Sequence, residues 1–503
     1  MTDSTLPAAA LQRLPSGIPG LDTILGGGFF RGGSYLLTGL AGNGKTILAN
    51  QVCFQHVAAG ERVVYLTMLA ETHDRMLAHL RPLSFFDAAA VGATLLYFSG
   101  FSVLQAEGLK GLMELVRRAV RDHQATLLVI DGLGSVAPFA ESPLAFNQFI
   151  YQLRAYLDVA GCTSLFTANT AEHLSPVAAT VVDGIIELHF THVGMRVVRE
   201  LEVRKFRGSD QLLGRHHFVI TDAGIIVYPR TEALLAVPSA VATEQQARLS
   251  TGVTDLDAML GGGLLAGSTT LLLGPSGSGK SILGLTVLAA GAQTDEPGLY
   301  FGFFETPPRL IGKGDQIGLD LGTKVQDGRI TFVWQPPLER SLDELADRLL
   351  TVVRQRGVRR LFIDGLNGFE TAAAYPERVG VVFTALSNEL RARDVTTIVS
   401  LETSDLFSSA ISVPIRDISA GVENILLLRY VELDAQLRRL ISIMKVRESG
   451  YDSAIREFNI GGQGITVAAT FASAQAILTG HARPGAAASP PAAAAQRTRK
   501  GGR

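Results

Sequence analysis

Two glycine-rich stretches decide the fold: Gly39-Leu40-Ala41-Gly42-Asn43-Gly44-Lys45-Thr46 and Gly274-Pro275-Ser276-Gly277-Ser278-Gly279-Lys280-Ser281. Both fit the pattern G-x-x-x-x-G-K-[ST], in which backbone N–H groups cradle nucleotide phosphates. An apolar run precedes each loop, and an apolar-periodic helix is predicted to begin near Thr46 and near Ser281. This order of strand, glycine loop and helix is the context that the motif requires, so the sequence predicts two phosphate-binding loops.

The residue types in the loops suit the binding of ATP with Mg²⁺. Glycine lets the backbone approach the phosphates, and the helix N-terminus directs its positive dipole end toward them. The two lysines are expected to neutralise the β- and γ-phosphates, and the residue after each lysine to offer a hydroxyl to Mg²⁺. The predicted nucleotide-binding residues are Gly39, Gly42, Asn43, Gly44, Lys45 and Thr46, and Gly274, Ser276, Gly277, Ser278, Gly279, Lys280 and Ser281. The alternative is a glycine-rich turn that happens to precede a lysine, and two copies in matching context argue against it.

The loops belong to a longer internal repeat. Arg13–Asp22, followed by three glycines at 26–28, returns as Arg248–Asp257, followed by three glycines at 261–263. The loop lysines are separated by the same 235 residues as these segments, so the repeat indicates a duplicated domain. We expect a first domain over residues 8–230, a linker over 231–247, a second domain over 248–480 and a disordered tail over 481–503.

Each half also has an aspartate at the end of an apolar strand. The predicted strands are 126–131 and 360–364, which end at Asp131 and Asp364. A carboxylate in this place, downstream of a phosphate-binding loop, holds the Mg²⁺ shell. The predicted metal residues are therefore Thr46, Asp131, Ser281 and Asp364. The alternative for the two aspartates is a simple Asp-Gly turn after a strand.

Apolar strands alternate with helical patterns along both halves, which predicts an α/β fold with mostly parallel sheets flanked by helices. Of the 503 residues, 47% are hydrophobic, and 45 Lys plus Arg nearly balance 47 Asp plus Glu. This balance argues against strong non-specific nucleic-acid binding. Cys53 and Cys162 have no ligand spacing and are expected to be reduced core thiols. No apolar run reaches the roughly 18 residues of a membrane helix, so we expect a soluble, cytoplasmic protein.

Further repeated segments carry a family resemblance. Residues 204–209 and 444–449 each contain Lys-x-Arg, and the second half also carries Tyr-Val-Glu at 430–432 and Ala-Ile-Arg-Glu-Phe at 454–458. With the paired loops, they make the chain similar to the KaiC family of tandem RecA-like ATPases from about residue 14 to residue 479. The resemblance implies two RecA-like P-loop domains, ATP and Mg²⁺ as ligands, and a double-ring homohexamer with ATP between subunits. It also implies regulatory protein partners of the clock or signalling type.

The Lys-x-Arg pairs match family residues that reach the γ-phosphate held by the adjacent subunit. They are Lys205, Arg207, Lys445 and Arg447. Cations supplied from a neighbour stabilise transition-state charge and couple hydrolysis to assembly. The alternative is a strand with exposed basic residues at alternate positions.

The chain departs from the family where the family has two adjacent glutamates. Here the strand ends are Ala70-Glu71 and Phe304-Glu305, so one carboxylate of each pair is missing. Glu71 and Glu305 are the predicted catalytic carboxylates, which orient or deprotonate the attacking water or hydroxyl.

The second departure concerns the adjacent Ser-Thr phosphosites of the family. Ser419 aligns with the serine and Ala420 with the threonine, so Ser419 is the one candidate phosphoacceptor that the alignment leaves. The alternative for Ser419 is a small polar residue at a turn.

The motifs predict Mg²⁺-dependent ATP hydrolysis, and the family resemblance implies that it occurs at the subunit interfaces of a ring, in a timing or other signalling role. One alternative is a serine/threonine autokinase, and another is a nucleotide-gated scaffold with little catalysis. A third is a DNA recombinase or helicase of the RecA group. Residues 132–144 contain no Lys or Arg, so the basic DNA-binding loop that such an enzyme needs is not evident.

Overall fold

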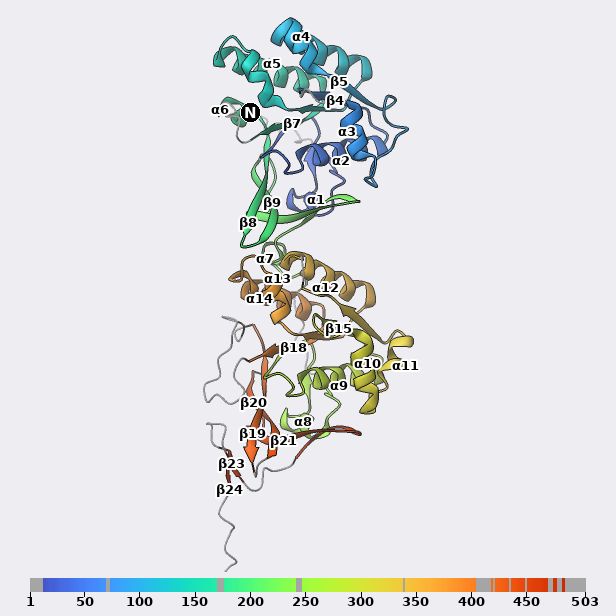
Figure 1. Ribbon diagram of the computed structural model, residues 1–503, viewed down its shortest axis with the longest axis vertical. Coiled ribbons are helices and arrows are strands. Elements are labelled where there is room, and N and C mark those ends of the chain that lie inside the picture. The colour runs from blue at the N-terminus through green and yellow to red at the C-terminus, as the bar shows by residue number, and fades with distance from the viewer. Residues whose placement is uncertain are drawn as a thin grey trace, which may run out of the picture. The chain divides into compact units, whose positions relative to one another are not determined.

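The computed structural model describes residues 12–68, 73–169, 176–240, 247–337, 340–403, 418, 421–433, 436–447, 450–468, 474–476 and 482–484. The contacts of the chain divide it into two compact units, Met1–Val237 with Arg340–Arg348 and Pro238–Glu339 with Leu349–Arg503. Each unit contains one nine-stranded sheet with helices packed against it, and Figure 1 draws the sheet of the first unit in blue to green and that of the second in yellow-green to red.

The first sheet has the strand order β11-β10-β9-β8-β3-β7-β6-β4-β5. The pairs from β8 to β5 are parallel, and β9, β10 and β11 extend the sheet with antiparallel pairs. Its strands are β3 (Ser34–Gly39), β4 (Val63–Thr67), β5 (Leu95–Ser99), β6 (Leu127–Asp131), β7 (Thr163–Asn169), β8 (Gly184–Val193), β9 (Arg196–Phe206), β10 (Arg215–Thr221) and β11 (Gly224–Tyr228).

The second sheet repeats this arrangement in the order β22-β21-β20-β19-β14-β18-β17-β15-β16, read from the opposite end. Its strands are β14 (Thr269–Gly274), β15 (Gly298–Gly302), β16 (Ile330–Trp334), β17 (Arg360–Asp364), β18 (Thr396–Glu402), β19 (Asn424–Leu433), β20 (Gln436–Val446), β21 (Arg456–Gly461) and β22 (Gly464–Val467). The α/β fold with mostly parallel, helix-flanked sheets is thus confirmed. The antiparallel extension is a feature that the sequence patterns did not predict.

The helices follow the same duplication. In the first unit they are α1 (Leu21–Ile24), α2 (Lys45–Ala58), α3 (His73–Leu80), α4 (Gly100–His123), η1 (Leu133–Phe139), α5 (Pro143–Ala160), α6 (Pro176–Val181) and α7 (Thr231–Leu234). Those that follow are α8 (Thr254–Met259), α9 (Lys280–Gln293), α10 (Pro307–Gln316), α11 (Leu321–Gln326), α12 (Leu342–Arg356), α13 (Asn367–Ala372) and α14 (Arg378–Ala392). The short strand pairs are β1 (Arg13–Leu14) with β2 (Phe29–Phe30), β12 (Arg248–Leu249) with β13 (Leu264–Leu265), and β23 (Ala474–Ala476) with β24 (Ala482–Pro484).

The central strands are buried on both faces, because successive side chains point to opposite sides of the sheet. In the first unit Leu37 and Tyr65 belong to the core that α2 covers, whereas Leu36 and Val64 belong to the core under α4 and α5. Helix α5 starts where Ser142 accepts a hydrogen bond from the N–H of Ala145, which caps the helix N-terminus.

The glycine immediately before each loop lysine has a left-handed backbone. Gly44 has φ 99° and Gly279 has φ 105°, a region that glycine adopts without steric cost. A Cβ on Gly279 would lie 2.8 Å from both Ile460 and Phe458. The turn from strand to helix therefore requires glycine, and it places Lys45 and Lys280 at the first position of their helices.

The domain limits drawn from the sequence stay predictions. Within the expected linker, Thr231–Leu234 form α7, and residues 241–246 lie outside the described residues. Within the expected tail, Ala482–Pro484 form β24, and the other positions of 481–503 likewise lie outside the described residues.

Candidate functional site

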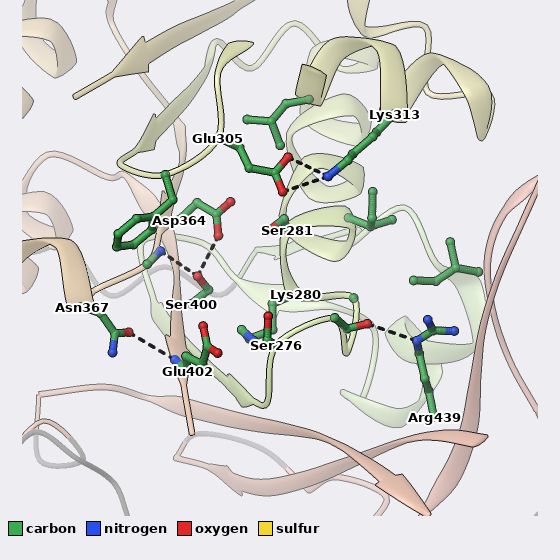
Figure 2. A pocket seen from close by; sticks show the side chains of 17 residues that line it. Ser276, Lys280, Ser281, Glu305, Lys313, Asp364, Asn367, Ser400, Glu402 and Arg439 are labelled. Carbon is green, nitrogen blue, oxygen red and sulfur yellow. Dashed lines mark hydrogen bonds and ion pairs between the residues drawn. The ribbon is translucent and has the colours of Figure 1, made fainter. Parts of the chain in front are cut away.

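Each sheet has a pocket at the carboxyl ends of its parallel strands, beside the glycine-rich loop. The first pocket has a volume of about 490 Å³ and the second about 550 Å³. The first is lined by Gly42, Gly44, Lys45, Thr46, Asp131, Thr167 and Asn169, among others. The second is lined by Ser276, Gly277, Gly279, Lys280, Ser281, Glu305, Lys313, Asp364, Ser400, Glu402 and Arg439, among others (Figure 2). Two chain segments 235 residues apart thus build the same kind of site.

The loop lysines fold back over their own loops. The Nζ of Lys45 donates to the carbonyl oxygens of Gly39 at 2.8 Å and Leu40 at 2.9 Å. The Nζ of Lys280 donates to the carbonyl oxygens of Gly274 and Pro275, both at 2.7 Å. Burial lowers the pKa of Lys280, and the nearby carboxylates of Glu402 and Asp364 oppose that shift. Each ammonium group is thereby held at the mouth of its loop.

Some of the predicted nucleotide-binding residues do not line the pockets. The side chain of Asn43 is buried and donates to the carbonyl oxygen of Leu188 on β8 at 2.6 Å. Ser278 is fully buried, and Gly39 and Gly274 are the last residues of β3 and β14. These positions shape the loop, whereas the later glycines, the lysine and the hydroxyl residue line each pocket, together with Ala41 in the first and Ser276 in the second.

Asp131 is the centre of the polar group in the first pocket. Its carboxylate accepts hydrogen bonds from Thr46 Oγ1 at 3.1 Å, from the Tyr65 hydroxyl at 2.7 Å and from the Thr167 hydroxyl. Tyr65 and Thr167 lie on β4 and β7, the two neighbours of the strand that ends at Asp131. The neighbouring strands thus fix the orientation of the carboxylate toward the start of α2.

Asp364 has the same surroundings in the second pocket. The Tyr300 hydroxyl and the Ser400 hydroxyl each donate to its carboxylate at 2.9 Å, and Ser281 also donates to it. Burial raises the pKa of Asp364, and the hydrogen bonds from Ser281, Ser400 and Tyr300 oppose that shift. The strand-end aspartate and the helix-start hydroxyl are in contact in both halves, as the sequence predicts.

The donor set at each of these positions fits Mg²⁺. A hydroxyl and a carboxylate converge next to the loop, and hard oxygen atoms are the ligands that Mg²⁺ takes in phosphate-binding sites. Buried hydroxyl donors hold each carboxylate from behind, an arrangement that orients metal ligands. Thr46 with Asp131 and Ser281 with Asp364 are the residues that would hold the ion.

Sequence reasoning missed the tyrosine and hydroxyl that support each aspartate. Tyr65 and Tyr300 are 235 residues apart, the spacing of the loop lysines, and Thr167 and Ser400 occupy matching strands. A search of the repeat for polar residues inside apolar strands would have found them. Their contact with the aspartate depends on strand order, which the repeat alone does not give.

Of the two predicted catalytic carboxylates, Glu71 lies outside the described residues. Glu305 lines the second pocket, next to Phe304, whose side chain is 62% exposed. Both carboxylate oxygens of Glu305 accept from the Nζ of Lys313, at 2.8 and 2.7 Å. The sequence indicated neither this ion pair nor the presence of Lys313 in the pocket.

Lys205 lies on β9 and Lys445 on β20, and Arg207 and Arg447 directly follow the ends of these strands. The Nζ of Lys205 donates to the carbonyl oxygen of Val182 at 2.6 Å, and that of Lys445 to Val422 at 2.8 Å. Burial, followed by the adjacent arginine, lowers the pKa of both lysines. Within the described residues, neither pocket is lined by Lys205, Arg207, Lys445 or Arg447. Ser419, the predicted phosphoacceptor, lies outside the described residues.

Comparison with known proteins agrees with this duplicated site. The family model described as "ATPase: KaiC" matches residues 14–232 and 249–471, one match for each half. The chain belongs to the KaiC family of ATPases. Nucleotide binding and ATPase activity follow from this family.

Two KaiC relatives align along nearly their whole length. The circadian clock protein KaiC3 of Synechocystis sp. is 26% identical over 492 residues, covering 93% of this chain and 94% of the relative. The circadian clock oscillator protein KaiC of Synechococcus elongatus is 27% identical over 487 residues, covering 94% and 92%. In the part of the chain that the structure describes, no helix is long and apolar enough to cross a membrane.

Proposed function

We propose that this KaiC-family protein binds Mg-ATP in both pockets and hydrolyses the bond to the γ-phosphate. Its role is in timing or other signalling. The observation that carries the proposal is the repeated contact between a helix-start hydroxyl and a strand-end aspartate beside a loop lysine. If one of the two domains served only a structural role, its pocket would not need the lysine, the hydroxyl and the aspartate.

The side chains of each pocket divide the chemistry between them. Lys45 and Lys280 hold the β- and γ-phosphates once they exchange their loop carbonyl partners for phosphate oxygens. The hydroxyl and aspartate pair of each pocket would hold Mg²⁺, which would neutralise phosphate charge there. Glu71 and Glu305 orient the attacking water, and the loss of their partner glutamates is the reason to expect slow turnover.

We also propose that neighbouring subunits of a homohexameric ring complete each site. Positive charge near the γ-phosphate stabilises the transition state, and the Lys-x-Arg residues line neither pocket of their own chain within the described residues. Mass photometry with and without ATP tests the assembly. A chain that stays monomeric at saturating ATP while it releases phosphate would contradict the ring.

Phosphate release from the double variant Lys45→Ala, Lys280→Ala tests hydrolysis itself. We expect a fall of about 100-fold or more, because each substitution removes the charge that faces the phosphates. Lys110→Ala is the matched control, because it removes an exposed lysine of α4 that lines neither pocket. Turnover that survives the double substitution would refute the proposal.

The clock relatives support a regulatory role, since they align over more than nine-tenths of this chain. A serine/threonine autokinase activity at Ser419 is the second reading, supported by its alignment with a phosphosite of the family. Phosphopeptide mapping after incubation with ATP decides it. If Ser419 is unmodified, the second pocket hydrolyses ATP without transferring phosphate to Ser419, and ATP-dependent assembly is the regulated property.

A further inference from the structure

Lys313 is one of two cations, with Arg439, that line the second pocket and have no counterpart in the described lining of the first. Glu71 and Glu305 are 234 residues apart, and the same spacing aligns Lys313 on α10 with His79 on α3. Lys313 lines the second pocket, whereas His79 is exposed and is absent from the described lining of the first. The second half therefore has a lysine in its pocket where the first half has an exposed histidine.

Lys313 faces the residue predicted to hold the attacking water. Its Nζ donates to Oε1 of Glu305 at 2.8 Å and to Oε2 at 2.7 Å, so both carboxylate oxygens have the same partner. Figure 2 shows this pair on the pocket wall, near Ser281. The side chains of Glu305 and Lys313 are 35% and 45% exposed, so water and a ligand reach both of them.

Resting on the proposed function, we propose that Lys313 is a positioning residue that restrains Glu305 and slows hydrolysis in the second pocket. The ammonium group of Lys313 bonds to both oxygens of Glu305, which fixes the direction of the carboxylate and draws electron density from it, so the remaining lone pairs orient and deprotonate a water less well. Glu305 therefore acts on the water more effectively once it has separated from Lys313. Phe304, which precedes Glu305, has an apolar ring where the family has the other glutamate of the pair, so it cannot substitute for Glu305.

The exposure of the pair sets the size of the effect. Partly exposed ion pairs hold their partners weakly, because solvent screens them. We therefore expect the restraint to slow the second pocket about two- to fivefold, which corresponds to about 0.4–1 kcal/mol in the activation free energy. Release of such a restraint predicts a gain of activity, which general damage to the fold does not produce.

The test isolates the second pocket in a full-length Lys45→Ala chain and compares it with the same chain carrying Lys313→Met. We expect kcat for phosphate release to rise about two- to fivefold, with KM for ATP changed by less than about twofold. Lys313→Arg keeps the cation and should return kcat to the starting value. In a Glu305→Gln background, Lys313→Met should change nothing, because the partner of the restraint is gone.

Binding is followed separately through Trp334, the only tryptophan of the chain. Its indole N–H donates to the carbonyl oxygen of Phe303 at 3.1 Å, and the next residue, Phe304, lines the second pocket. An ATP-dependent change in Trp334 fluorescence shows that the variant is folded and binds nucleotide. The same comparison with Lys45 intact should give a smaller rise, because the first pocket adds a constant rate.

Three results would overturn the inference. A fall in kcat with a tenfold rise in KM would make Lys313 a phosphate contact. An unchanged kcat would mean that the ion pair does not restrain Glu305. A gain that persists in Glu305→Gln would place the effect elsewhere. Each of these differs from failure of the proposed function, in which Lys45→Ala, Lys280→Ala still releases phosphate.

Discussion

Tyr300→Phe removes one hydroxyl group and so tests whether the hydrogen bond from Tyr300 to Asp364 supports the proposed Mg²⁺ site of the second pocket. The Tyr300 hydroxyl donates to Asp364 Oδ2 at 2.9 Å, and burial, with Asp364 as the next cause, raises the pKa of the phenol. The phenol therefore stays protonated and acts as a donor throughout the working pH range. Its removal leaves Asp364 with the hydroxyls of Ser281 and Ser400.

The size of the loss follows from the charge of the acceptor. A hydrogen bond to a charged group contributes about 1.5–3 kcal/mol, and burial already raises the pKa of Asp364. Removing one donor raises it further and disfavours the ionised form that Mg²⁺ requires. We expect the apparent Mg²⁺ affinity of the second pocket to fall about 10- to 100-fold, the range found when a residue that supports a metal ligand is lost.

The assay is phosphate release against Mg²⁺ concentration at fixed ATP, in a Lys45→Ala chain that silences the first pocket. Tyr156→Phe is the matched control, because its hydroxyl donates to the backbone of Arg117 and Tyr156 lines neither pocket. The midpoint should move to higher Mg²⁺ with Tyr300→Phe and stay in place with Tyr156→Phe. An unchanged midpoint for Tyr300→Phe would refute the assignment of Asp364 to the metal shell.

Three further predictions concern the scaffold. Gly279→Ala should destabilise the second unit by about 1–3 kcal/mol in urea unfolding, because a left-handed backbone and the contacts with Ile460 and Phe458 oppose a side chain. Gly312→Ala should instead stabilise it by about 0.5–1 kcal/mol, since Gly312 lies inside α10 with open space around it. Burial lowers the pKa of His56, so the unfolded chain binds a proton that the folded chain does not. Stability should therefore fall as pH drops below about 6.5, by at most about 1.4 kcal/mol per pH unit, and His56→Met should remove that slope in unfolding followed by circular dichroism.

The parts of the site that are local in sequence could be predicted, and the parts that depend on strand order could not. Lys45, Thr46 and the glycines lie within eight consecutive residues, so a motif identifies them. Asp131 follows from its strand, but its contact with Tyr65 exists because β4 pairs with β6. Apolar runs do not specify which strands become neighbours.

The same reasoning explains the antiparallel half of each sheet. Residues 184–228 contain strand-forming patterns, yet period and composition do not distinguish a parallel from an antiparallel partner. The register of β8 against β9 brings Lys205 back beside Ile185, close to Val182, and so gives it its carbonyl partners. The sequence predicted that Lys205 and Arg207 are functional, but the antiparallel pairing of β8 with β9 determines where Lys205 lies.

The two pockets differ more in the residues next to the loop than in the residues around the strand-end aspartate. The groups around the metal position are the same or nearly the same, with Asp131 matched by Asp364 and Thr167 by Ser400. Next to each loop, however, β7 ends at Asn169, paired with Gly39, whereas β18 ends at Glu402, paired with Gly274. Together with Lys313, this places the divergence around Glu305, the residue proposed to orient the attacking water. Two copies of one domain can bind the same nucleotide and still turn it over at different rates when only the groups that face the water change.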